Sequence, residues 1–262
     1  MSRKKKPTSP PPLSSPKLLS APASSRWRHV FSVSLLIAFA LIAYANTFHV
    51  PFVFDDEYNI IKNTSVHPNT FSLQWLHQLL QASFAESIRV FSYFTFALNY
   101  YFGGLNVFGY HLVNLLIHIG SGLILYWFLL LTFRLPPLRE RYGSRAFPIA
   151  LFSSLLFLCH PVQTQSVTYI VQRMASMAGL LYLLAMVLYV KGRLVSGVRR
   201  YLFFGGMFLT YLLGLFTKEN VAILPLFIAL YEFYFFQALE VSGKGRRALV
   251  YTDSITGRHV EL

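Results

Sequence analysis

Six long apolar runs constrain this chain more than any other feature of its sequence. They lie at about residues 29–47, 110–132, 146–160, 174–190, 201–216 and 220–239. A helix needs roughly 20 apolar residues to cross the hydrocarbon core of a bilayer, and the shorter runs can gain a turn from their flanks. Only 13% of the residues are charged, against roughly 25% in a soluble domain. The sequence therefore predicts an all-α polytopic membrane protein with about six transmembrane helices.

The runs divide the chain into three segments. Residues 1–28 form a basic tail rich in Ser and Pro, which is expected to be disordered. Residues 29–240 form the membrane domain, with a large loop at about 48–108, and residues 241–262 form a polar tail. An Ala-x-Ala pattern at Ala43-Tyr44-Ala45 leaves open a cleaved signal peptide, but the long basic segment before it favours a retained first span.

Basic residues are distributed unequally between the two ends of these spans. With six spans, one side carries only four of the 23 lysines and arginines, namely Lys62, Arg89, Arg173 and Lys218. Because basic residues accumulate on the cytoplasmic side, both termini are expected in the cytoplasm. The 48–108 loop then faces the periplasm of a bacterial inner membrane or the lumen of the endoplasmic reticulum. The net charge of +13 is thus a topology signal, and no nucleic-acid partner is expected.

An acidic stretch, Phe54-Asp55-Asp56-Glu57-Tyr58, follows the first span within this loop. Carboxylates beside a bilayer are costly and usually functional. Further along the loop, residues 71–85 have helical spacing that places four apolar side chains on one face; these are Phe71, Trp75, Leu79 and Leu80. This pattern predicts a helix lying at the membrane interface, where a membrane-anchored substrate could be met.

Polar side chains also gather at the outer ends of the later spans. His111 opens the second span and His160 closes the third, while Arg173 opens the fourth and Lys218-Glu219 lies between the fifth and sixth. Solvation or helix capping explains each one alone. As a set they are expected to converge with the acidic stretch on one interfacial site.

Such a set would suit glycosyl transfer from a polyprenyl-phosphate sugar to a protein or glycan hydroxyl. A carboxylate can remove the proton from the attacking hydroxyl, and adjacent carboxylates raise one another's pKa toward neutral pH. Arginine and lysine can stabilise the leaving phosphate, and the available cations are Arg89, Arg173 and Lys218. No cofactor is certain.

Metal binding is the alternative use of the acidic stretch. Its three carboxylates, with His111 or His160, offer the oxygen-rich ligands that Mg²⁺ or Mn²⁺ prefers.

Four segments together resemble one family. They are FVFDDEYNIIKN, FTFALNYYFGGLNVFGYHLVNLLIH, LCHPVQTQSVTYIVQRMASMAGLLYLL and LLGLFTKEN, within about residues 50–235. In order and spacing they are similar to the membrane part of the transmembrane-and-tetratricopeptide-repeat proteins, which are protein O-mannosyltransferases in animals. Bacterial relatives look closer around residues 160–177.

The resemblance implies a GT-C fold with interfacial helices in its first outer loop. It also implies that Asp56 is the general base, with Asp55 as the second candidate. Arg173 and Lys218 then bind the donor phosphate together with Arg89, and the supporting residues are Glu57, His111, His160 and Glu219.

The chain departs from the family pattern in three ways. Val90 stands where a proline often follows the arginine, and Gln165 stands where an acid is common. No 34-residue repeat is present, and the polar tail replaces the next span. The chain is therefore expected to be a fragment, a truncated product or a six-span half.

Two other classes of function stay open from the sequence. One is a non-catalytic membrane protein that keeps the fold to bind lipid or support assembly. The other is a transporter, which is disfavoured because Glu232 is the only charged residue inside a span, and ion paths usually need several.

Overall fold

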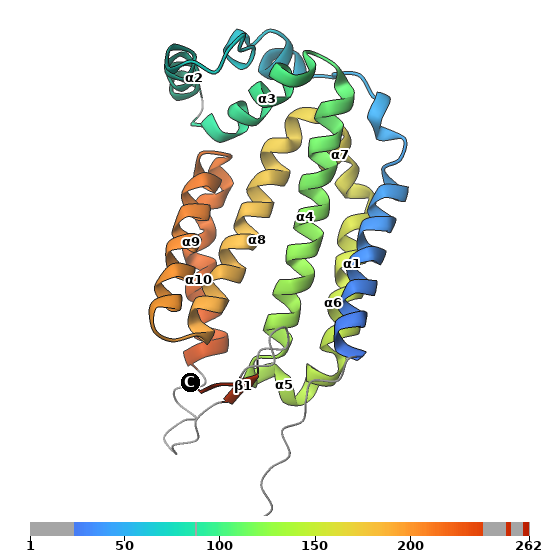
Figure 1. The fold of residues 1–262 in the computed structure, drawn as a ribbon, viewed down its shortest axis with the longest axis vertical. Coiled ribbons are helices and arrows are strands. Elements are labelled where there is room, and N and C mark those ends of the chain that lie inside the picture. The colour runs from blue at the N-terminus through green and yellow to red at the C-terminus, as the bar shows by residue number, and fades with distance from the viewer. Residues whose placement is uncertain (1–23, 87, 238–249, 253–258, 262) are drawn as a thin grey trace, which may run out of the picture.

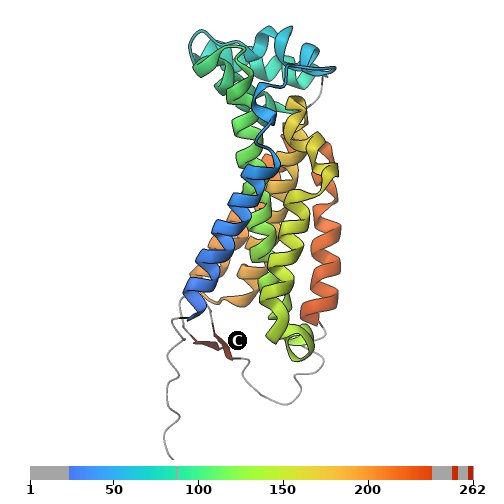
Figure 2. The ribbon, with the colours of Figure 1, turned by 90° about the vertical axis from the view of Figure 1, so that its right-hand side faces the viewer.

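A bundle of long helices running along one axis forms most of the molecule, and smaller helices cap one end of it (Figure 1). The computed structural model describes residues 24–86, 88–237, 250–252 and 259–261. The predicted tails at 1–28 and 241–262 therefore lie largely outside the described residues. Turning the molecule shows the cap again at a single end of the bundle (Figure 2).

The helices of the bundle correspond to the six apolar runs. They are α1 (Ser24–Ala43), α4 (Val107–Phe133), α6 (Ala146–Cys159), α8 (Arg173–Leu194), α9 (Val198–Leu215) and α10 (Leu224–Glu232). Five helical stretches in the described part are long and apolar enough to cross a membrane; these are Arg26–Ala43, Val107–Phe133, Pro136–Cys159, Ile170–Leu194 and Glu219–Phe236. The prediction of an all-α polytopic membrane protein is confirmed.

The fifth run, which forms α9, falls outside those five stretches. Arg199 and Arg200 lie in its first turn and lower its mean hydropathy. The helix nevertheless packs against α8 along the bundle (Figure 1). Gly197, with φ of 66°, forms the sharp turn that lets α9 fold back on α8, a conformation that glycine adopts at low cost.

Close packing brings α4 and α6 together. A Cβ atom on Gly122 would lie 2.6 Å from the Leu158 side chain, so only glycine permits this approach. Asn106 begins α4 as its N-cap, its side chain accepting a hydrogen bond from the Phe108 N–H at 3.0 Å.

The cap is built from the 48–108 loop. It contains η1 (Thr47–His49), η2 (Glu57–Ile61), η3 (Thr64–Val66), α2 (Leu73–Glu86) and α3 (Val90–Gly103). The predicted helix at 71–85 is confirmed as α2, whose Trp75 and Leu79 are buried, whereas Phe71 is exposed. Its buried residues join those of α3 and the heads of α4 and α8 in one apolar cluster, so the cap is fixed to the bundle.

The remaining elements are short. On the cap side they are η5 (Pro161–Gln163), α7 (Thr164–Thr168), η6 (Ile170–Gln172) and η7 (Glu219–Ile223). At the other end are α5 (Pro136–Tyr142), η4 (Gly143–Arg145) and η8 (Phe233–Gln237), with the antiparallel strands β1 (Val250–Thr252) and β2 (His259–Glu261) (Figure 1). The basic segments at 134–145 and 191–200 therefore lie at the end opposite the cap.

Candidate functional site

Asp56 holds the acidic stretch against the bundle. Its side chain is fully buried, with Oδ2 accepting the Val53 N–H at 2.9 Å and Oδ1 accepting the Val171 N–H at 2.7 Å. Burial raises the pKa of this carboxyl, and the two backbone hydrogen bonds oppose that rise. Asp56 thus ties the loop to η6, directly before α8, and does not present its carboxylate to the surface.

Asp55 points the other way and is exposed. Its backbone N–H donates to the Tyr169 hydroxyl at 3.0 Å, which fixes the turn. Phe54 just before it has φ of 48°, a left-handed conformation that is uncommon for a bulky residue and often marks a functional site. Burial raises the pKa of the Tyr169 phenol, and the nearby Asp55 carboxylate also contributes to this rise.

Glu57, the third acid, belongs to a surface ion pair. Its Oε1 lies 2.6 Å from Lys62 Nζ, and both side chains are more than half exposed. Exposed pairs of this kind contribute about 0–1 kcal/mol. The expected supporting role of Glu57 has no counterpart in contacts to the other site residues.

Arg173 is enclosed within the protein. Its guanidinium donates to Asn114 Oδ1 at 2.7 Å, to the Tyr110 carbonyl at 2.9 Å and to the Thr95 carbonyl at 3.2 Å. It also lies over the Phe96 ring, 4.6 Å from the centroid. That Arg173 binds the donor phosphate stays a prediction; in the structure the side chain is fully buried, and each of its three nitrogens already donates one hydrogen bond. Its contacts join α8 to α3 and α4.

The two histidines of the expected site have different surroundings. His111 is buried beneath the loop, with Nε2 bonded to the Val50 carbonyl at 2.8 Å and Nδ1 without a partner among the described residues. Its interaction with Asp56 lowers the pKa of that carboxyl, against the larger effect of burial. His160 Nδ1 accepts the Val162 N–H at 3.2 Å and caps η5. Both histidines therefore support the backbone.

The described part of the chain contains no cluster of side chains that would support the metal-binding alternative. Within it, no group of three or more His, Cys, Asp and Glu side chains could hold an ion. The burial of Asp56 and the pairing of Glu57 separate the three carboxylates that were expected to share one.

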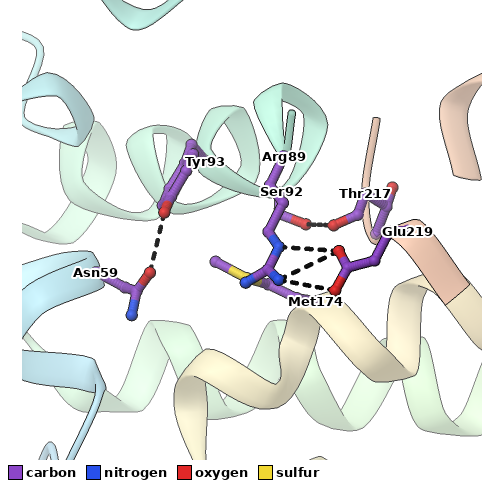
Figure 3. Close-up of polar contacts among 7 residues, drawn as sticks. All are labelled: Asn59, Arg89, Ser92, Tyr93, Met174, Thr217 and Glu219. Atoms are coloured by element: carbon purple, nitrogen blue, oxygen red, sulfur yellow. Dashed lines mark hydrogen bonds and ion pairs between the residues drawn. The ribbon is translucent and has the colours of Figure 1, made fainter. Parts of the chain in front are cut away.

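An ion pair connects the cap to the turn between α9 and α10. Arg89 forms a forked contact with Glu219, from Nη2 to Oε1 at 3.0 Å and to Oε2 at 3.1 Å, and from Nε to Oε2 at 3.3 Å (Figure 3). Ser92 Oγ donates to the Thr217 carbonyl at 3.0 Å beside it. Arg89 Nη1 also approaches Met174 Sδ, 3.9 Å away on α8. The Arg89 side chain remains 28% exposed.

Asn59 and Tyr93 link this ion pair to the acidic stretch. Asn59 Nδ2 donates to the Asp55 carbonyl at 2.8 Å. Asn59 Oδ1 accepts a hydrogen bond from the Tyr93 hydroxyl at 2.9 Å (Figure 3). Tyr93 lies one helical turn after Arg89, whose carbonyl accepts its N–H. Sequence reasoning missed both residues, as well as Tyr169 and Asn114. The signal available for Asn59, Tyr93 and Tyr169 was their spacing of four residues from Asp55, Arg89 and Arg173, respectively.

Lys218 completes the outer cations. It is half-buried beside Glu219, and its ammonium makes no hydrogen bond or ion pair with the described residues. Of the four cations expected on this side, Arg173 is enclosed and exposed Lys62 is paired with Glu57, which leaves Arg89 and Lys218 beside the turn between α9 and α10.

These features define a class of protein: a multi-pass all-α membrane protein with a polar site between a loop-built cap and one end of its bundle. Three curated relatives specify it further. The chain is 33% identical over 161 residues to "Protein O-mannosyl-transferase tmtc2" of Xenopus laevis, covering 59% of this chain and 18% of that protein. It is 30% identical over 177 residues to "Protein O-mannosyl-transferase F38B6.6" of Caenorhabditis elegans, covering 65% and 24%. It is 29% identical over 213 residues to "Protein O-mannosyl-transferase TMTC2" of Homo sapiens, covering 78% and 24%.

The chain is thus TMTC-like, and the resemblance predicted from its motifs is confirmed. It spans 18–24% of the length of these curated relatives. No family model and no solved structure matches it. The GT-C assignment stays a prediction.

Proposed function

We propose that the chain carries the acceptor-activating part of a membrane glycosyltransferase, which moves a sugar from a polyprenyl-phosphate donor to a hydroxyl of a protein acceptor. Relatives that match 58–78% of the chain are named protein O-mannosyl-transferases, so mannose is the sugar to test first.

The observation that carries the proposal is the division of labour between Asp55 and Asp56. A general base must reach the proton that it removes. Asp55 is exposed on a turn held by Tyr169 and by buried Asp56, whereas Asp56 already accepts two backbone hydrogen bonds. Asp55 is therefore our candidate for the base, and Asp56 is the residue that positions it.

The leaving phosphate needs cations on the same face. Arg89 is connected to the acidic turn through Asn59 and Tyr93, and Lys218 lies across the ion pair from it. An arginine fork and a lysine point charge together suit a phosphate monoester or diester. Arg173 is left out of this group because it is enclosed.

The proposed orientation follows from charge. The cap end carries the acidic stretch, and the opposite end carries the basic segments at 134–145 and 191–200. By the positive-inside rule the cap faces the periplasm or lumen, and both termini face the cytoplasm. A lipid-linked donor would reach such a site from within the bilayer.

A transfer assay tests the proposal. The chain is reconstituted in liposomes with a radiolabelled polyprenyl-phosphate mannose donor and a serine- and threonine-containing peptide. Wild-type chain is expected to label the peptide, Asp55→Asn to lose labelling, and Glu57→Gln, the neighbouring surface acid, to retain it. Labelling by Asp55→Asn at the wild-type rate would remove the base assignment. Absence of any transfer by the wild-type chain would instead favour a non-catalytic lipid-binding protein.

A further inference from the structure

A surface cavity of about 290 Å³, open to the outside of the bundle, lies between α8, η7 and α10. It is lined by Ala178, Gly179 and Tyr182 of α8, by Asn220, Val221 and Ile223 of η7, and by Phe227 of α10. Its walls are mostly apolar, apart from Asn220 and the Tyr182 hydroxyl, which has no partner among the described residues. The volume is at the lower end of the range for ligand pockets, roughly 300–1,000 Å³. It fits a stretch of hydrocarbon chain better than a whole polar metabolite.

The cavity lies directly next to the outer cations. Met174, which contacts Arg89, is one helical turn before Ala178 in the cavity wall. Lys218 and Glu219 immediately precede Asn220 in the opposite wall. A ligand with an apolar chain in the cavity would therefore carry its polar end to Arg89 and Lys218, where the complementary charge is negative.

Glu219 occupies the fork of Arg89 in this structure. A carboxylate and a phosphate present similar paired oxygens to a guanidinium, so they compete for the same donors. Glu219 is 70% exposed, and exchanging its contact for one with a phosphate would cost little, since exposed ion pairs contribute little to stability.

We propose that the cavity receives the hydrocarbon chain of a lipid phosphate, and that the phosphate displaces Glu219 from Arg89. The inference rests on the proposed function for the choice of a lipid phosphate. It adds where the hydrocarbon chain of the lipid lies. It also identifies the Glu219 carboxylate as the group that contacts Arg89 where the phosphate would bind. Displacing Glu219 also removes one link between the cap and η7, while the Ser92–Thr217 hydrogen bond remains.

Gly179 allows a direct test of the cavity. Gly179 lies in the cavity wall and a Cβ atom added there meets no heavy atom within 4 Å, so Gly179→Leu is chosen to place a side chain in the cavity. Gly205 in α9 has equally open surroundings and lies away from the cavity, so Gly205→Leu is the matched control. The full chain in nanodiscs is titrated with farnesyl phosphate, and with farnesol and inorganic phosphate as comparison probes.

Farnesyl phosphate is expected to bind more tightly than either comparison probe. Gly179→Leu should weaken its binding by about tenfold or more, the loss expected when a buried hydrocarbon segment is excluded, while Gly205→Leu should bind like the wild type. Glu219→Gln should tighten binding by about two- to fivefold, because it removes the competitor. Equal binding by the two glycine variants, or weaker binding by Glu219→Gln, overturns the inference.

Binding and transfer separate this inference from the proposed function. If farnesyl phosphate binds as expected but no sugar is transferred, the site stands and the transferase proposal fails. If sugar is transferred while Gly179→Leu binds farnesyl phosphate like the wild type, the transferase proposal stands. The cavity is then not the site of the hydrocarbon chain.

Discussion

At the end of the bundle away from the cap, the Glu232 carboxylate accepts hydrogen bonds from Tyr189 and from Arg193, whose Nη2 lies 2.7 Å from its Oε1. At the capped end, Asp55 is exposed and Lys218 makes no hydrogen bond or ion pair with the described residues. Both ends combine an acid, a tyrosine and a cation. The side chains of the Tyr189–Arg193–Glu232 group bind one another and join α8 to α10. Asp55 and Lys218 at the capped end are instead available to bind a ligand.

Asp55→Asn is the change expected to distinguish the two ends most. If Asp55 is the general base, its loss should lower the transfer rate by about 10²–10⁴-fold, with little change in unfolding temperature because the side chain is exposed. Asp56→Asn should instead lower stability, since buried Asp56 holds the turn. Initial rates of peptide labelling and thermal unfolding measure the two effects. A loss of rate confined to Asp56→Asn would reverse our assignment.

Arg173→Gln should cause the largest loss of stability, about 2–5 kcal/mol, because it leaves the Asn114 side chain and the Tyr110 carbonyl without their buried charged partner. Denaturant unfolding in detergent measures it. Exposed Arg139 provides the control, for which Arg139→Gln should stay within about 0.5 kcal/mol of the wild type. A wild-type-like Arg173→Gln protein that has lost only phosphate binding would restore the ligand role expected from the sequence.

Glu232→Gln should lower the free energy of unfolding by about 1 kcal/mol. The group is partly exposed, and the substitution removes the negative charge that Arg193 and Tyr189 contact. Transfer activity and farnesyl phosphate binding should be unchanged, because the residue lies at the end opposite the cap. Unfolding and binding measured on the same preparation test this. A Glu232→Gln protein that folds normally but transfers sugar slowly would contradict a purely structural role for the end opposite the cap.

The raised pKa of Asp56 predicts a smaller, pH-dependent effect. A carboxyl with a folded-state pKa above its ordinary value of 3.8 binds its proton more tightly when folded. Its contribution to stability is therefore complete below pH 3.8 and is lost as the pH rises through the folded-state pKa. The difference in free energy of unfolding between wild type and Asp56→Asn should therefore shrink as the pH rises from 3.8 through the folded-state pKa of Asp56. A constant difference would mean that burial does not perturb Asp56.

Apolar runs predicted most of the fold because burial in a bilayer leaves a strong linear signal. The six runs match α1, α4, α6, α8, α9 and α10 to within a few residues, apart from the ends of the first and last. The helix α2 was predicted from the spacing of Trp75 and Leu79. Helix α3 was not separately predicted, because the segment from Val90 to Gly103 is so uniformly apolar and aromatic that it has no distinct polar face.

The candidate site was predicted less completely. Sequence reasoning found the acidic stretch and the Arg89, Lys218 and Glu219 positions. It placed the general base at Asp56, which stays a prediction, whereas the exposure of Asp55 leads us to propose Asp55 for that role. Adjacent residues differ in direction, and which of the two faces inward depends on the turn at Phe54 and on the Val171 N–H, 115 residues away. Such a distant contact leaves no local pattern.

The sequence alone determined that this protein is polytopic and all-α, and that its acidic stretch and its basic loops lie at opposite ends, because hydropathy and charge asymmetry are read along the chain. Tertiary structure decided which charges are usable. Arg173 and Arg89 have the same chemistry, yet Arg173 is enclosed by Asn114 and aromatic rings, while Arg89 lies on a partly open ion pair above a cavity. The free energy of a charge depends on its surroundings, and only the packed helices supply them.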